Sequence, residues 1–206
     1  MAAFVAALVR PDCDGLEFDV RASADGIAVV LHDLTLQRVQ GRPEAAADLP
    51  AAALRELGVP SLADVLAACP PTAFLDVELK EDLGAVVLGP LRAARGLPDG
   101  ALSNAVVSAF EPASLATIRR LAPAVACWLN ADDLEPATLD LALALGCRGI
   151  SVEWRAIDAR ISAAVARAGL DLAAFTFSSR RTLARLARLG VVAACVEGAA
   201  LGDVPR

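Results

Sequence analysis

Two short stretches of the sequence combine closely spaced carboxylates with the only histidine and the only lysine of the chain. Glu17 and Asp19 alternate with apolar residues in the run 15–21, so both point to one face if this run is a strand. Glu78 and Lys80 alternate in the same way in the run 72–80. His32 follows a short apolar run that the Asp-Gly turn at 25–26 would fold back onto the first strand as a hairpin.

These residue types are the components of a metal-assisted hydrolytic site. Carboxylates flanked by apolar residues are costly to bury unless a cation or hydrogen-bond donors satisfy them. Three carboxylates without a cluster of Cys or His favour a hard divalent cation, Mg²⁺ or Ca²⁺, over zinc. Lys80 would add a second positive charge for a developing anion, and His32 would transfer a proton.

Each of these residues also has a simpler interpretation. Glu17 and Asp19 fit a strand edge that faces water, Glu78 and Lys80 fit a plain ion pair, and a single histidine fits an ordinary polar position. Their joint placement on neighbouring strands favours a shared site. Weaker candidates are a carboxylate beside a tryptophan, two aromatic residues of core or pocket wall, and loop acids that read as solvated charge: Glu153, Phe175, Phe177, Asp82, Asp132 and Asp133.

The composition limits the class of protein. The 206 residues suit a single domain over 1–206, and 56% of them are hydrophobic, yet no apolar run approaches the ~20 residues of a membrane span. The N-terminus lacks the basic segment of a signal peptide, so we expect a cytoplasmic protein without a membrane span. A net charge of −6 argues against a nucleic-acid partner. The five cysteines are scattered without CxxC spacing, which predicts free thiols.

The order of predicted elements indicates an α/β protein. A helix over 2–10, the hairpin and short helices at 51–57 and 61–68 precede a regular alternation of strand and helix. Strands are expected near 16, 73, 104, 124, 149, 171 and 192, and later helices over 83–95, 112–121, 135–145, 158–168 and 179–189. This pattern predicts a parallel sheet with right-handed crossovers.

Seven parallel strands are one fewer than a closed TIM (β/α)8 barrel needs. We therefore expect a TIM-type barrel that is incomplete at the N-terminus, with its first strand lying before Met1. A doubly wound open sheet alternates similarly, but no Gly-rich phosphate loop follows any strand. Because barrel sites form at the C-terminal strand ends, Glu17 and Asp19 are expected to end the first strand seen here, and Glu78 and Lys80 the next.

Four blocks of sequence resemble the glycerophosphodiester phosphodiesterase family. They are Gly15-Leu-Glu-Phe-Asp-Val-Arg, Asp25-Gly-Ile-Ala-Val-Val-Leu-His-Asp with Leu36 and Arg38, Pro60-Ser-Leu-Ala-Asp-Val-Leu, and Asp76-Val-Glu-Leu-Lys. The resemblance implies a TIM-barrel enzyme that hydrolyses glycerophosphodiesters, small-molecule substrates, to glycerol 3-phosphate and an alcohol with a divalent cation. By position, Glu17, Asp19 and Glu78 match the metal ligands, His32 the second of two catalytic histidines, and Lys80 the phosphate-contacting lysine.

The chain departs from the family pattern in three places. The strand with His-Arg-Gly and the following Glu-Asn-Thr are absent, and Val196-Glu-Gly stands where relatives carry Thr-Asp. Three hypotheses follow: an enzyme with impaired activity because half of the acid–base machinery is missing, an inactive barrel that binds a phosphorylated or phosphodiester ligand, or a start codon chosen too late for a longer protein. An incomplete barrel also predicts self-association through its open edge, or a displaced segment that covers it.

Overall fold

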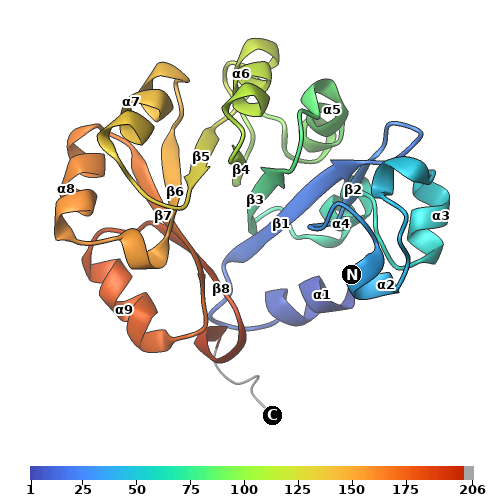
Figure 1. The fold of residues 1–206 in the computed structure, drawn as a ribbon, viewed down its shortest axis with the longest axis horizontal. Coiled ribbons are helices and arrows are strands. Elements are labelled where there is room, and N and C mark those ends of the chain that lie inside the picture. The colour runs from blue at the N-terminus through green and yellow to red at the C-terminus, as the bar shows by residue number, and fades with distance from the viewer. Residues whose placement is uncertain (202–206) are drawn as a thin grey trace.

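The computed structural model describes residues 1–201, apart from the side chain of Ala199, so the last five residues of the predicted domain 1–206 lie outside it. One curled sheet forms the centre of the fold, and helices cover its outer face (Figure 1). The strands are β1 (Gly15–Ala22), β2 (Ala28–Val30), β3 (Phe74–Leu79), β4 (Ala105–Ala109), β5 (Cys127–Ala131), β6 (Gly149–Glu153), β7 (Asp171–Phe177) and β8 (Ala193–Val196). The helices are α1 (Ala2–Leu8), α2 (Gln37–Gln40), α3 (Ala51–Glu56), α4 (Leu62–Ala68), α5 (Gly84–Arg95), α6 (Pro112–Leu121), α7 (Pro136–Ala144), α8 (Ala159–Arg167) and α9 (Arg180–Arg188).

The strands run in the order β2-β1-β3-β4-β5-β6-β7-β8. All pairs from β1·β3 to β7·β8 are parallel, and only β2 is antiparallel to its neighbour. The expected alternation, the seven parallel strands and the hairpin are therefore confirmed. Within residues 1–201, β1 and β8 do not pair, so the barrel-type sheet stays open at that side.

One sequence expectation about β1 is wrong. Glu17 and Asp19 do not end this strand, which continues to Ala22 because β2 pairs with its last three residues. The parallel pairing with β3, in contrast, reaches only from Gly15 to Val20. The two carboxylates therefore lie in the middle of β1, with Glu17 opposite Asp76 and Asp19 opposite the predicted partner Glu78 near the end of β3.

The main hydrophobic core fills the space between the sheet and its helices. Alternate residues of β1 and β3, such as Phe18 and Val77, are almost fully buried there. A smaller core lies under the connection 34–60, around Leu36 and Leu54. The predicted capping box at the start of α4 is confirmed: Ser61 Oγ accepts from the Asp64 amide, and Asp64 Oδ2 accepts from the Ser61 amide.

Helix α1 lies at the open side of the sheet, next to β1 (Figure 1). It begins without a side-chain cap, as expected from its sequence, and none of its residues is fully buried. Its main aromatic contact is Phe4 against Phe18, with ring centroids 5.7 Å apart. Among the described residues, no helix has both the length and the apolar composition required to cross a membrane.

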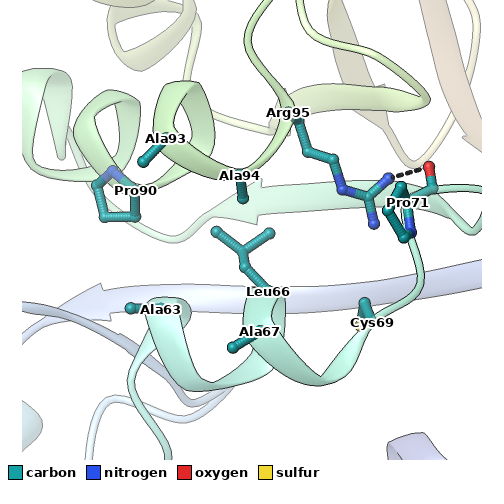
Figure 2. Close-up of a pocket in the computed structure, with 9 residues that line it drawn as sticks. All are labelled: Ala63, Leu66, Ala67, Cys69, Pro71, Pro90, Ala93, Ala94 and Arg95. Carbon is teal, nitrogen blue, oxygen red and sulfur yellow. Dashed lines mark hydrogen bonds between the residues drawn. The ribbon is translucent and has the colours of Figure 1, made fainter.

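A shallow groove of about 440 Å³ lies on the outer side of the sheet between α4 and α5 (Figure 2). Its walls are mostly apolar side chains such as Leu66 and Pro90. The buried guanidinium of Arg95 closes one end and donates to the carbonyl oxygens of Pro70, Pro71 and Ala73, each at 2.9 Å. None of the predicted site residues lines this groove.

Candidate active site

The three predicted carboxylates converge on the inner face of the sheet. Glu17 and Asp19 come from β1 and Glu78 from β3, and one oxygen of each lies within 4.8 Å of the others. Strand alternation puts Glu17 and Asp19 on the same face, and the register places Asp19 directly opposite Glu78. Such a group of carboxylate oxygens has the composition of a site for a hard divalent cation.

Lys80 lies against two of these carboxylates. Its ammonium nitrogen is 2.9 Å from Asp19 Oδ1, and it also donates to Glu78 Oε1. Only 17% of the side chain is exposed. Burial by itself would lower the pKa of Lys80, but the contacts with Glu78 and Asp19 raise it above its ordinary value. Lys80 is therefore a fixed positive charge at the carboxylate group.

The electrostatics of the group favour partial protonation when no cation is bound. Burial raises the pKa of Glu17 to about 8, and the charges of Asp19, Asp76 and Glu78 contribute to the rise. Burial also raises the pKa of Glu78, although Lys80 opposes this shift. A divalent cation would supply the positive charge that these groups lack, and its binding would release protons.

Asp76 is a fourth carboxylate of the inner face that was not among the predicted site residues. It precedes Glu78 by two positions on β3 and lies opposite Glu17 in β1. Burial raises its pKa to about 7, although the hydroxyl of Ser108 donates to its Oδ1 at 2.6 Å and opposes the shift. Two features of the sequence could have indicated this residue. Asp76 shares a strand face with Glu78, and its partner Ser108 is the only polar residue of the otherwise apolar strand β4.

Two further polar groups reach the carboxylates from distant strands. Asn130 of β5 donates from Nδ2 to Glu78 Oε2 at 3.2 Å and is almost fully buried. The thiol of Cys195 in β8 donates to Glu17 Oε2 at 3.5 Å. Neither residue was predicted to belong to the site, and the only available signal was a polar residue within an apolar strand.

His32 lies beside the carboxylate group rather than within it. The amide of the preceding residue, Leu31, donates to the backbone oxygen of Asp19 at 3.0 Å, which places the histidine next to the site. Its side chain is 62% exposed, and its charge lowers the pKa of Glu78 without a direct hydrogen bond. Arg21 donates from both Nε and Nη2 to its backbone oxygen, at 3.1 and 3.0 Å.

The orientation of the imidazole is set by Asp33. Nδ1 of His32 lies 2.7 Å from Asp33 Oδ1, and since a carboxylate only accepts, we assign the proton to Nδ1. Arg38 donates to both oxygens of Asp33, at 2.6 and 3.0 Å. The hydrogen bonds from Arg38 and, to a smaller extent, from His32 hold the pKa of Asp33 well below its usual range. Within residues 1–201, Nε2 of His32 makes no hydrogen bond, so it can accept or donate a proton.

The weaker sequence candidates lie outside the carboxylate group. Glu153 pairs with Arg155 at 2.5 Å, and Asp82 accepts a hydrogen bond from Thr117 at 2.8 Å. Phe177 is buried against Trp154 in the core, and Asp132 and Asp133 are exposed in a loop. Phe175 packs edge-on against Phe110, with ring centroids 5.6 Å apart. Phe110 is 41% exposed, and the Lys80 ammonium nitrogen lies over its ring, 5.9 Å from the ring centroid.

Several solved structures with the same fold are phosphodiesterases by name. A phosphodiesterase from Oleispira antarctica, in complex with the product sn-glycerol-3-phosphate, is 22% identical with a TM-score of 0.81, over 94% of this chain and 84% of that one. A glycerophosphodiester phosphodiesterase from Thermotoga maritima is 19% identical with a TM-score of 0.80, over 97% and 88%. One from Agrobacterium tumefaciens is 20% identical with a TM-score of 0.73, over 97% and 90%.

Sequence identities of 19–22% to these solved structures show a common fold. The family membership is shown by a separate comparison of the sequence with family models. No curated protein matches the chain. The model of the glycerophosphoryl diester phosphodiesterase family, however, matches residues 1–199, nearly the whole chain. This match includes the strands that carry the carboxylates, the histidine and the lysine. The chain therefore belongs to the glycerophosphoryl diester phosphodiesterase family, and its enzyme class is that of the phosphoric diester hydrolases.

Proposed function

We propose that this chain hydrolyses glycerophosphodiesters to glycerol 3-phosphate and an alcohol with the help of a divalent cation. One observation carries the proposal: Glu17, Asp19 and Glu78 present oxygens within 4.8 Å of one another beside the Lys80 ammonium. A divalent cation held by these carboxylates would, together with Lys80, offer positive charge to an anionic phosphodiester, which the carboxylates alone would repel. Membership of the family supports the substrate class.

The residues fit Mg²⁺ or Ca²⁺ better than a softer metal. All three candidate ligands are carboxylates, which suit hard cations. Burial raises the pKa of the nearby Cys195 thiol to about 12, and the charge of Glu17 adds to the rise, so the thiol is neutral beside the metal-free carboxylates. When bound, the cation would polarise a phosphoryl oxygen and stabilise the negative charge that develops on it.

The remaining roles fall to Lys80 and His32. The Lys80 ammonium would contact a non-bridging phosphate oxygen, since its charge lies at the edge of the carboxylate group. His32 would move a proton through Nε2, because Asp33 holds Nδ1. This chain has one histidine for two proton transfers, to the leaving alcohol and from the attacking water. We therefore expect slow turnover, reduced by about 10²–10⁴-fold relative to a site with both groups.

Release of glycerol 3-phosphate from glycerophosphocholine tests this proposal. The wild-type chain should release it when Mg²⁺ or Ca²⁺ is present and stop when a chelator is added, and Glu78→Gln should abolish the reaction. The matched control is Glu153→Gln. Glu153 is also a glutamate in the parallel sheet, at the end of β6, but it pairs with Arg155 and is not one of the three clustered carboxylates. Equal activity of the two variants would contradict the assignment.

A second function, binding of a phosphorylated or phosphodiester ligand without turnover, is favoured by one observation. His32 is exposed and makes no direct hydrogen bond to the three carboxylates. In that case calorimetry would detect cation-dependent binding of glycerol 3-phosphate, while no substrate would be consumed.

Further proposals concern the state of the protein. We infer that residues 1–206 act as one domain in the cytoplasm and that copies self-associate through the open side of the sheet. In support, all four residues of the edge strand β8 are only half-buried, and the neighbouring Val192 is 63% exposed. Light scattering tests the association: a monodisperse monomer at all concentrations would contradict it.

A further inference from the structure

Asn130 is the buried polar residue on the inner face of β5. It is 6% exposed, and the strand around it, Cys127–Ala131, is otherwise built from apolar side chains and one cysteine. The only hydrogen bond of its side chain among the described residues goes from Nδ2 to Glu78 Oε2, at 3.2 Å. Asn130 and Glu78 are 52 positions apart in the sequence, so the contact exists only because the sheet curls.

The hydrogen bond to Glu78 leaves the other end of the Asn130 amide without a partner among the described residues. That end is Oδ1, which is buried. Turning the amide over would bring Oδ1 against a carboxylate oxygen, and two acceptors repel each other. The orientation of Asn130 is therefore determined by Glu78, because a hydrogen bond to a charged group outweighs the unpaired oxygen.

The carboxylate of Glu78 is held from two sides as a result. Lys80 donates to Oε1 and Asn130 donates to Oε2. Lys80 reaches the carboxylate on a long stem with several rotatable bonds, whereas the short side chain of Asn130 has two and is 6% exposed. The asparagine amide therefore has fewer alternative positions than the ammonium.

We propose that Asn130 is a positioning residue, whose amide holds the Glu78 carboxylate in the orientation in which it binds a divalent cation. This inference rests on the proposed function, because it takes Glu78 as a cation ligand. Groups that hold a metal ligand in place affect metal affinity without touching the metal, and their loss typically weakens binding about 10–100-fold.

The experiment compares two buried polar residues on neighbouring strands. Asn130→Leu keeps most of the side-chain volume and removes the donor. Ser151→Ala is the matched control, since Ser151 is 5% exposed, pairs with Asn130 in the sheet, and makes no hydrogen bond to the carboxylates. The dissociation constant of Ca²⁺ is measured by calorimetry for the wild-type protein and both variants, and circular dichroism checks their folding. Asn130→Ala replaces Asn130→Leu if the latter does not fold.

We expect the dissociation constant to rise about 10–100-fold in the Asn130 variant and to stay unchanged in Ser151→Ala. Equal binding by wild type and the Asn130 variant would overturn the positioning role. A similar loss in both variants would also overturn it, because a general packing defect would then explain the result. If the wild-type protein binds neither Ca²⁺ nor Mg²⁺, the proposed function itself fails, which is a distinct outcome.

Discussion

The ammonium nitrogen of Lys80, the residue directly after β3, lies 2.9 Å from Oδ1 of Asp19 in the neighbouring strand β1. The two residues are 61 positions apart in the sequence, yet their contact places the only lysine of the chain at the carboxylate group. Lys80 also donates to Glu78, so it neutralises part of the negative charge there. A group that bridges two carboxylates in this way is both a structural counter-charge and a positive charge available to an anionic substrate.

Replacing Lys80 tests whether its positive charge contributes to the reaction. In Lys80→Met the positive charge is lost while most of the apolar stem remains, and we expect kcat to fall about 10²–10³-fold, as for loss of one charge-stabilising donor. Lys80→Arg keeps the charge with a different geometry and should retain part of the activity. The release of glycerol 3-phosphate at saturating substrate gives kcat. An unchanged kcat in Lys80→Met would remove the lysine from the reaction.

Cation binding should appear as thermal stabilisation. A ligand that binds only the native state raises the free energy of unfolding, by about 2.7 kcal/mol at 100 times its dissociation constant. Millimolar Mg²⁺ or Ca²⁺ should therefore raise the melting temperature of the wild-type protein. Glu78→Gln should abolish the rise, whereas Glu153→Gln should preserve it. If Glu78→Gln still responds fully, Glu78 does not bind the cation.

The stability of the cation-free protein should fall as the pH rises from about 5 to 8. Burial raises the pKa of Glu17 from 4.5 to about 8, and that of Asp76 from 3.8 to about 7. Within this window the native state holds protons that the unfolded state has released, so raising the pH favours unfolding, by at most about 1.4 kcal/mol per pH unit for each group. Urea unfolding at several pH values in the presence of a chelator measures the slope.

Glu17→Gln provides the control for this pH dependence. The variant cannot ionise at this position, so its slope should be shallower than that of the wild-type protein. Saturating Ca²⁺ should also reduce the wild-type slope, because cation binding favours the ionised carboxylates. A wild-type stability that increases from pH 5 to pH 8 without cation would contradict the raised pKa of Glu17.

The contact between His32 and Asp33 predicts that substitutions along the chain His32, Asp33 and Arg38 lower kcat to different extents. His32→Ala removes the proton-transfer group and should lower kcat about 10²–10⁴-fold. Asp33→Asn leaves the histidine but replaces the charged acceptor of its Nδ1 proton by a neutral amide, so it should lower kcat by a smaller factor with little change in KM. Arg38→Met should resemble Asp33→Asn, because Arg38 holds both oxygens of Asp33. Undiminished activity in His32→Ala would remove this histidine from the mechanism.

The sequence alone determined which candidate residues share a strand face, because this follows from local rules. Alternation along a strand is a local property, so it correctly placed Glu17 with Asp19, and Glu78 with Lys80, on shared faces. The hairpin turn and the capping box at Ser61 are equally local, since each depends on residues within a few positions. The regular exchange of strands and helices was sufficient to predict the parallel sheet.

The tertiary structure decided how those faces meet. Register between strands depends on pairing over long sequence distances, so only the fold shows that Asp19 lies opposite Glu78 and that β1 continues past both carboxylates to Ala22. The support of Glu78 by Asn130 comes from a strand 52 positions away, because curling of the sheet brings the inner side chains of β3 and β5 together. Local sequence patterns contain no information about which distant side chain supplies such a hydrogen bond.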